Sequence, residues 1–112
     1  MTGVALAFVV AAAAGTLARA TLGRWLNQAF PWGTFAVNVT GSFALGLLSH
    51  ASTLVATVVG TGLLGAYTTF SSFARDAVAL WERRARVAAV IYAAVSIVAC
   101  VGAAWSGIAL VA

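Results

Sequence analysis

Long apolar stretches, separated by a few short polar segments, fill almost the whole chain of 112 residues. Several of them approach the roughly 20 residues that a helix needs to cross the hydrocarbon core of a bilayer. Charged residues make up 7% of the sequence, whereas a soluble domain carries about a quarter. The sequence therefore predicts a single integral membrane domain, 1–112, with very little mass outside the bilayer.

The expected fold class is all-α. A bilayer offers no partner for unpaired backbone groups, so only helices and closed barrels can span it, and the alternating pattern of barrel strands is absent from this sequence. Polar interruptions divide the chain into four predicted transmembrane helices, at about 4–22, 33–49, 53–81 and 87–111. The first helix lacks the basic segment that begins a signal peptide, so we interpret it as a membrane span.

The third predicted helix contains the least helix-like segment of the chain, GAYTTFSSFARD at 65–76. Glycine lowers helix propensity by about 1 kcal/mol relative to alanine, and hydroxyl side chains compete for backbone hydrogen bonds. We therefore expect this helix to break near its middle, at about 65–69. Such a break is tolerated at membrane depth only where protein or a water-filled cavity surrounds it.

Polar side chains recur every four residues on two other helices, so each set shares one helix face. These residues are Thr34, Asn38 and Ser42 on the second helix, and Tyr92, Ser96 and Cys100 on the fourth. Two interpretations remain open, because such groups either form hydrogen bonds between helices or line a path for an ion. The pair Phe70 and Phe73 is open in the same way: aromatic rings can pack in a core or direct their positive edges toward an anion.

The few charges are placed where they need explanation. Arg19 lies near the end of the first helix, where it either extends to the interface or attracts anions to a vestibule. Arg75 and Asp76 are adjacent and point about 100° apart on a helix, so each needs another partner or water, which indicates a polar cavity. The net charge of +4 is too sparse for nucleic-acid binding, the single Cys100 permits no internal disulfide, and we do not expect an enzyme.

Three motifs together resemble the Fluc or CrcB family of small fluoride channels. They are GTLAR at 15–19, PWGTFAVNVTGSFALG at 31–46 and GLLGAYTTFSSF at 62–73, and the resemblance extends over essentially the full chain. It implies a passive fluoride exporter of the plasma membrane that relieves fluoride toxicity. It also implies an antiparallel dimer with two pores at the subunit interface.

The resemblance further implies roles for individual residues. The fluoride pore set comprises five residues that match pore positions and two that share the face of Asn38: Asn38, Phe70, Phe73, Tyr92, Ser96, Thr34 and Ser42. Arg19 matches the arginine of the first helix, and Asp76 stands where the family commonly has a glutamate. Gly65 and Thr68 match positions whose main-chain carbonyls hold a structural sodium ion at the centre of the dimer.

Some positions depart from the family pattern. Ala66 and Tyr67 do so within the break, and Cys100 and Ala104 replace positions that usually carry a hydroxyl on the fourth helix. Two other functions stay open, a small four-helix multidrug transporter and a non-transporting subunit of a membrane assembly. The transporter needs a membrane-embedded carboxylate, which the first helix lacks. The assembly subunit would explain the small residues but not the polar and aromatic motifs.

Charge placement predicts an orientation. Arg24, Arg83, Arg84 and Arg86 fall on one side of the predicted four-span topology, opposite His50. The positive-inside rule then places both termini outside the cytoplasm. A homodimer of oppositely oriented subunits needs a weaker bias, so the partner is either a second copy or, favoured by the bias, a paralogous subunit of opposite orientation.

Overall fold

The computed structural model describes residues 2–112, and over that range it is helical apart from short connections, with no strand. The elements in chain order are α1 (Thr2–Leu26), α2 (Trp32–Leu47), α3 (Thr53–Val55), the π-helical η1 (Ala56–Leu64), α4 (Gly65–Tyr67), α5 (Phe70–Glu82) and α6 (Arg86–Val111). The predicted all-α class is confirmed.

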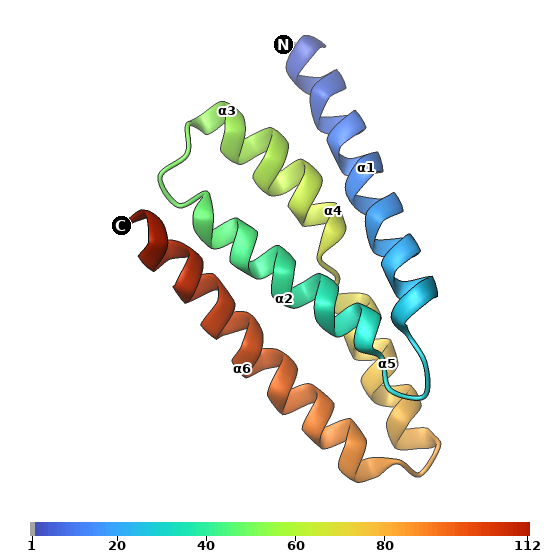
Figure 1. Ribbon diagram of the computed structural model, residues 1–112. Helices are drawn as coiled ribbons and strands as arrows, with labels where there is room; N and C mark the ends of the chain where they lie inside the picture. The colour runs from blue at the N-terminus through green and yellow to red at the C-terminus, as the bar shows by residue number, and fades with distance from the viewer. Residues whose placement is uncertain (1) are drawn as a thin grey trace.

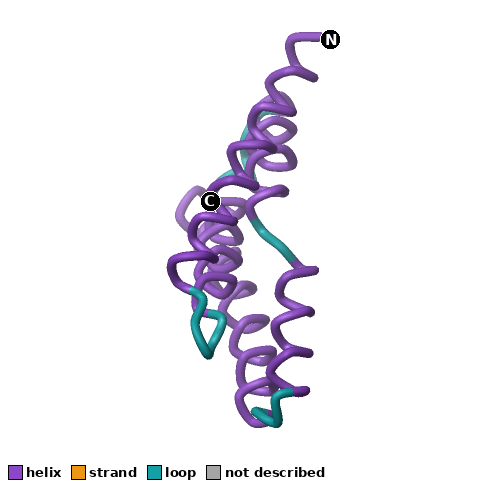
Figure 2. The backbone as a smooth tube through the Cα atoms, turned by 90° about the vertical axis from the view of Figure 1, so that its right-hand side faces the viewer, coloured by secondary structure: helices purple, strands orange, loops and turns teal. Residues whose placement is uncertain are grey.

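The helices lie side by side in a flat slab with principal extents of 49 × 30 × 18 Å, which Figure 2 shows from its narrow side. In Figure 1, α2 lies between α6 on one side and the η1–α4 segment on the other, and α1 covers that segment. The α1–α2 and α5–α6 connections lie at one end, where Arg83 Nη2 donates a hydrogen bond of 2.8 Å to the carbonyl of Ala29. Both termini and the α2–α3 connection lie toward the other end (Figure 1).

Three helical stretches are long and apolar enough to cross a membrane: Thr2–Leu26, Thr53–Glu82 and Arg86–Val111. Their outward surfaces carry many exposed apolar side chains, as lipid contact requires. The chain is therefore a multi-pass membrane protein. The second predicted span is shorter, because α2 has 16 residues and a helix of that length rises only about 24 Å.

The third stretch is interrupted at Thr68 and Thr69, within the range predicted for the break. Both residues have extended backbone, with φ −74° and ψ 151° at Thr68 and φ −149° and ψ 111° at Thr69. Thr68 Oγ1 donates to the carbonyl of Leu64 at 2.9 Å, and Thr69 Oγ1 accepts from the amide of Ser72 at 3.0 Å. The hydroxyl groups thus end one helix and cap the next.

The nine residues of η1 form a π-helix, which the sequence analysis did not predict. Such helices are rare beyond a single turn and are often found beside functional sites. This one packs against α1 through glycine: a Cβ atom added at Gly15 would overlap the carbonyl of Leu63, and one added at Gly62 would lie 3.3 Å from Phe8. The segment that leads into the break is therefore held close to α1.

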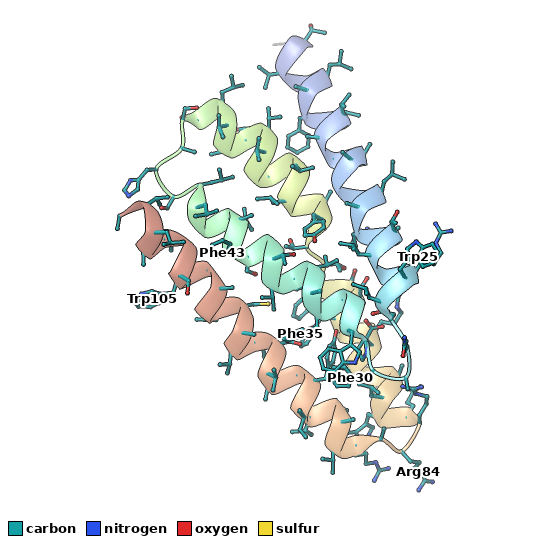
Figure 3. All side chains as sticks on the ribbon, in the orientation of Figure 1. Trp25, Phe30, Phe35, Phe43, Arg84 and Trp105 are labelled. Atoms are coloured by element: carbon teal, nitrogen blue, oxygen red, sulfur yellow. The ribbon has the colours of Figure 1, made fainter. Side chains whose placement is uncertain are left out.

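The core lies between α2, α5 and α6. Tyr92 is fully buried and packs with Leu80 and Ala89, and the rings of Phe30 and Phe35 surround them (Figure 3). Farther along α6, its backbone approaches α2 so closely that a Cβ atom at Gly107 would overlap the carbonyl of Phe43. Small residues at such positions are how membrane helices reach close backbone contact.

Alanine substitutions at two glycines of α6 should therefore have opposite effects. Gly107→Ala forces the α2 backbone away, and overpacking of this kind costs about 1–3 kcal/mol. Gly102→Ala is the matched control, because nothing lies within 4 Å of its added Cβ, and the better helix former should stabilise by up to about 1 kcal/mol. Thermal unfolding of the detergent-solubilised protein measures both effects. Equal melting temperatures for the two variants would contradict the close α2–α6 contact.

Candidate functional site

The helix break is held from the side by Asn38 of α2. Its Oδ1 accepts a hydrogen bond of 2.7 Å from the amide of Thr69, and its Nδ2 donates one of 3.1 Å to the carbonyl of the same residue. The two bonds give one non-helical peptide unit the partners that its own helix cannot supply. A primary amide has two N–H groups, so one of them remains for another acceptor.

A cavity of about 260 Å³ lies beside this contact, and we call it the phenylalanine cavity. Its lining residues come from α2, the break, α5 and α6: Asn38, Ser42, Thr68, Thr69, Phe70, Phe73, Ser96, Ile97 and Cys100. Five of the seven predicted pore residues are thus brought together here. Thr34 and Tyr92 are not in its lining.

Three aromatic rings form a continuous stack at one wall. Phe70 and Phe73 have ring centroids 5.8 Å apart and tilted by 47°, and Phe73 lies 5.3 Å from the ring of Tyr92. Phe70 is 79% exposed, whereas Tyr92 is completely buried. Phe73 therefore joins the open cavity to the core, and Tyr92 lies behind it.

Two buried hydroxyl groups of α6 have no hydrogen-bond partner among residues 2–112. They are Tyr92 Oη and Ser96 Oγ, which lie one helical turn apart. An unpaired buried hydroxyl costs about 1–3 kcal/mol, so both groups are available to a further hydrogen-bond partner. Ser96 lines the phenylalanine cavity, and its hydroxyl group can donate a hydrogen bond there.

A second cavity, of about 310 Å³, has a basic and polar lining, and we call it the arginine cavity. It is formed by α1, its following loop, α2 and α5, with the residues Arg19, Ala20, Gly23, Arg24, Asn27, Thr34, Val37, Thr69, Ser72 and Arg75. Three guanidinium groups face a space that holds no carboxylate in its lining. This electrostatic arrangement attracts anions.

Arg19 also joins α1 to the break, because its Nε donates a hydrogen bond of 3.2 Å to the carbonyl of Ala66. Its two predicted roles, extension to the interface and attraction of anions, both stay predictions. Asp76 finds its partner on α2, where Thr34 Oγ1 donates to Oδ2 at 2.7 Å. Arg75 Nη2 donates only a long bond of 3.5 Å to Ser72 Oγ.

Asn27 is a site residue that the sequence analysis missed. Its Oδ1 accepts from the amides of Gly33 at 2.7 Å and Thr34 at 3.1 Å, and it thereby caps α2 from the preceding loop. Pro31 precedes the helix and provides no side-chain cap. An asparagine shortly before a helix that starts at proline was the available signal.

Thr69 is the one residue that lines both cavities. The phenylalanine cavity and the arginine cavity therefore meet at the helix break. Because the backbone between them is non-helical, a small ion can meet backbone and amide groups there instead of helix side chains. Broken membrane helices that line a cavity commonly present backbone groups and helix ends to ions.

The break also changes the environment of the carbonyls predicted to bind sodium. In a continuous helix the amide of Thr69 would donate to the carbonyl of Gly65, but here it donates to Asn38. The carbonyl of Thr68 lies in the extended segment itself. Backbone oxygens freed in this way are suitable ligands for a hard cation. No group of three His, Cys, Asp or Glu residues that could hold a metal ion is found within residues 2–112.

Comparison with known protein families places the chain in one of them. The model of the family described as "CrcB-like protein, Camphor Resistance (CrcB)" matches residues 6–108. The chain belongs to the CrcB-like family. The match covers most of α1 and of α6 and everything between them, including the break.

Curated relatives of this chain carry the name of fluoride-specific ion channels. A protein of Chelativorans sp., named fluoride-specific ion channel FluC, is 45% identical over 93 residues, covering 77% of this chain and 74% of the relative. A protein of Symbiobacterium thermophilum, named fluoride-specific ion channel FluC 1, is 43% identical over 113 residues, covering 90% and 91%. FluC of Rhizobium etli is 39% identical over 117 residues, covering 95% and 94%.

The positions that depart from the CrcB-like pattern have identifiable contacts. Tyr67 Oη and Thr40 Oγ1 share a hydrogen bond of 2.9 Å, so this residue fastens the break to α2. Cys100 is half-buried and lines the phenylalanine cavity. Ala104 instead contributes its carbonyl to the close contact with Gly46.

Substitution by aspartate should change the stability of the protein differently at Asn38 and at Asn27. Asn38→Asp removes the donor to the Thr69 carbonyl and places a carboxylate next to it, so we expect a loss of about 1–3 kcal/mol in the free energy of unfolding. Asn27→Asp is the matched control. It keeps an acceptor for both amides at the start of α2, where negative charge is favourable, and it loses only the long bond of 3.4 Å from Nδ2 to Thr34 Oγ1.

Thermal unfolding in detergent measures this difference at neutral pH. The melting temperature should fall for Asn38→Asp and stay constant or rise for Asn27→Asp. If both variants unfold at the wild-type temperature, Asn38 does not hold the break as described.

Proposed function

We propose that this chain forms a fluoride-selective channel that exports fluoride passively from the cytoplasm and so relieves fluoride toxicity. The proposal is carried by one observation: two cavities, one basic and one aromatic, both include Thr69 of the helix break in a member of a family whose relatives are named fluoride-specific ion channels. A channel needs no catalytic residue, in agreement with the expectation that the chain is not an enzyme.

The chemistry of the lining suits a small anion that sheds its water. The arginine cavity, with Arg19 at the break, concentrates anions at the entrance. The free N–H of Asn38 and the hydroxyls of Ser42 and Ser96 then replace water as hydrogen-bond donors. The edges of Phe70 and Phe73 carry positive partial charge and stabilise the ion without protonating it.

Thr34, Tyr92 and Asp76 act beside this path. Thr34 lines the arginine cavity and donates to Asp76, so this pair fixes the position of α5 against α2. Tyr92 supports Phe73 through their ring contact. Its unpaired hydroxyl becomes a donor to the ion if Phe73 moves aside.

The functional unit is an antiparallel dimer with pores at the subunit interface. A single chain leaves Phe70 79% exposed at the wall of the phenylalanine cavity, and a second subunit would enclose it. In this arrangement α2 also crosses the membrane, which gives each subunit four spans. It packs along α6 through Gly46 and Gly107. The dimer lies in the plasma membrane and is surrounded by lipid.

A sodium ion at the dimer centre would hold the two breaks together. The main-chain carbonyls of Gly65 and Thr68 fit this role, because the break removes their usual helical partners and Na⁺ binds oxygen ligands. These carbonyls belong to the backbone, so the departures at Ala66 and Tyr67 leave the ligand atoms in place.

The orientation and the partner follow from charge. Arg24, Arg83, Arg84 and Arg86 lie at the end formed by the α1–α2 and α5–α6 connections, which favours that end in the cytoplasm. So strong a bias favours a paralogous subunit of opposite orientation over a second copy. The relative named FluC 1 has a numbered name, as expected where a genome encodes more than one channel subunit.

Fluoride efflux from proteoliposomes tests the function. Wild-type protein, reconstituted alone and with any paralogue encoded beside it, should release fluoride but not chloride when a potassium gradient is discharged. Phe70→Ile should reduce the rate by at least about tenfold, which corresponds to a loss of about 1.4 kcal/mol in stabilisation of the ion. Val98→Ile, on the exposed outer face of α6, is the control and should conduct normally.

No fluoride-selective efflux in either preparation would refute the channel. Normal efflux with Phe70→Ile would leave the function intact and remove Phe70 from the path.

Cysteine accessibility in cells tests the orientation. In a Cys100→Ser background, Gln28→Cys in the α1–α2 connection should react with a membrane-impermeant maleimide only after permeabilisation. His50→Cys, at the opposite end, should react in intact cells. Equal labelling of both positions from outside would contradict a fixed orientation and favour the homodimer.

A further inference from the structure

A groove at the corner between α5 and α6 is unrelated to the two cavities. It has a volume of about 300 Å³ and is lined by Trp81, Arg86, Val87, Val90 and Ile91. We propose that this groove binds one anionic phospholipid, with the acyl chain along the apolar wall and the phosphate on Arg84 and Arg86. The site depends on the membrane orientation proposed above but not on fluoride conduction.

The wall of the groove suits a hydrocarbon chain. Val87, Val90 and Ile91 are 74%, 59% and 50% exposed, and they follow one another along a single face of α6 with helical spacing. Trp81 lines the groove from α5. Apolar surface of this extent at the end of a membrane helix is covered by lipid acyl chains.

The mouth of the groove carries charge that the protein does not neutralise. The guanidinium of Arg86 lies over the ring of Trp81, with its Cζ 5.0 Å from the ring centroid. Stacking of this kind fixes the guanidinium plane and leaves its N–H edges free for a phosphate. Within residues 2–112, guanidinium hydrogen bonds are made only by Arg19, Arg75 and Arg83, so Arg84 and Arg86 keep all their donors.

Arg84, the second proposed phosphate ligand, has a left-handed backbone conformation. Its φ is 68°. Its amide donates to the carbonyl of Trp81, and the amide of Ala85 donates to the carbonyl of Leu80. These two bonds form a common helix-ending motif, in which glycine normally occupies the position of Arg84. An arginine is strained in this left-handed conformation, whereas glycine adopts it readily because it has no Cβ atom. Figure 3 shows its side chain extending away from the protein at the corner.

The charges around the corner select an anionic lipid rather than a neutral one. Arg83, Arg84 and Arg86 lie within four residues, and Glu82 is the acidic residue beside them. Basic groups at the cytoplasmic end of membrane helices attract anionic headgroups. A free phosphate ion would satisfy the arginines but would leave the apolar wall uncovered, so the geometry favours the intact lipid.

Native mass spectrometry of the purified full chain in detergent tests the proposal. The probe is an equimolar mixture of phosphatidylglycerol and phosphatidylcholine with the same acyl chains. We expect preferential retention of phosphatidylglycerol, reduced about fivefold by Arg84→Gly and about fivefold by Arg86→Gln, the effect of removing one basic residue near an anionic surface. Arg24→Gln, at the same end of the molecule but outside the groove, is the control and should retain the preference.

Thermal unfolding of the same variants separates binding from folding. Arg84→Gly should melt at or above the wild-type temperature, because glycine relieves the left-handed backbone, and still lose the lipid. Equal retention of the two lipids by the wild type would overturn the site. If Arg24→Gln lost phosphatidylglycerol to the same extent, diffuse attraction between basic residues and anionic lipid would replace the proposed site. Displacement of the lipid by an equal concentration of inorganic phosphate would also overturn the site.

Discussion

The structure depends on a side-chain amide that replaces a stretch of helix. A membrane helix satisfies its own backbone, so any interruption leaves polar groups that lipid cannot pair. Asn38 supplies both missing hydrogen bonds to Thr69. Without it, the two extended residues would have to return to a helix, and the two cavities beside them would lose their common boundary.

The other groups near the break are satisfied one by one from neighbouring elements. Thr68 and Thr69 use their hydroxyls on the ends of the adjoining helices, and Arg19 reaches the carbonyl of Ala66 from α1. The carbonyls of Gly65 and Thr68 are left for an external ligand in our proposal. The break is thus held to the protein by hydrogen bonds with α1 and α2.

The features that the sequence could predict are local ones. Apolar length identified the membrane helices, and the hydroxyl-rich segment identified the break to within the residues observed, because both depend on neighbours in the chain. The spacing of Thr34, Asn38 and Ser42 correctly indicated a shared helix face. It could not indicate that Thr34 pairs with Asp76 while Asn38 clamps Thr69, since that depends on the register of α2 against the two halves of the broken helix.

The sequence also could not predict the π-helical geometry of η1 or the burial of Tyr92 behind Phe73, because both arise from packing between distant segments. The identity of the dimer partner and the sodium ion at the dimer centre involve more than one chain, and both stay predictions. The family resemblance supplied residue roles that spacing alone left open, and the structure adds Asn27 and the shared position of Thr69 to that set.

Amide hydrogen exchange at Thr69, followed by NMR in detergent micelles, tests the central interaction most directly. Our account predicts slow exchange in the wild type, although the residue is not helical, because its N–H donates to the partly buried side chain of Asn38. In Asn38→Ala the exchange of this amide should accelerate by roughly tenfold or more, the factor that corresponds to about 1.4 kcal/mol, while the amides in the middle of α6 stay protected. Rapid exchange at Thr69 in the wild type would contradict the account.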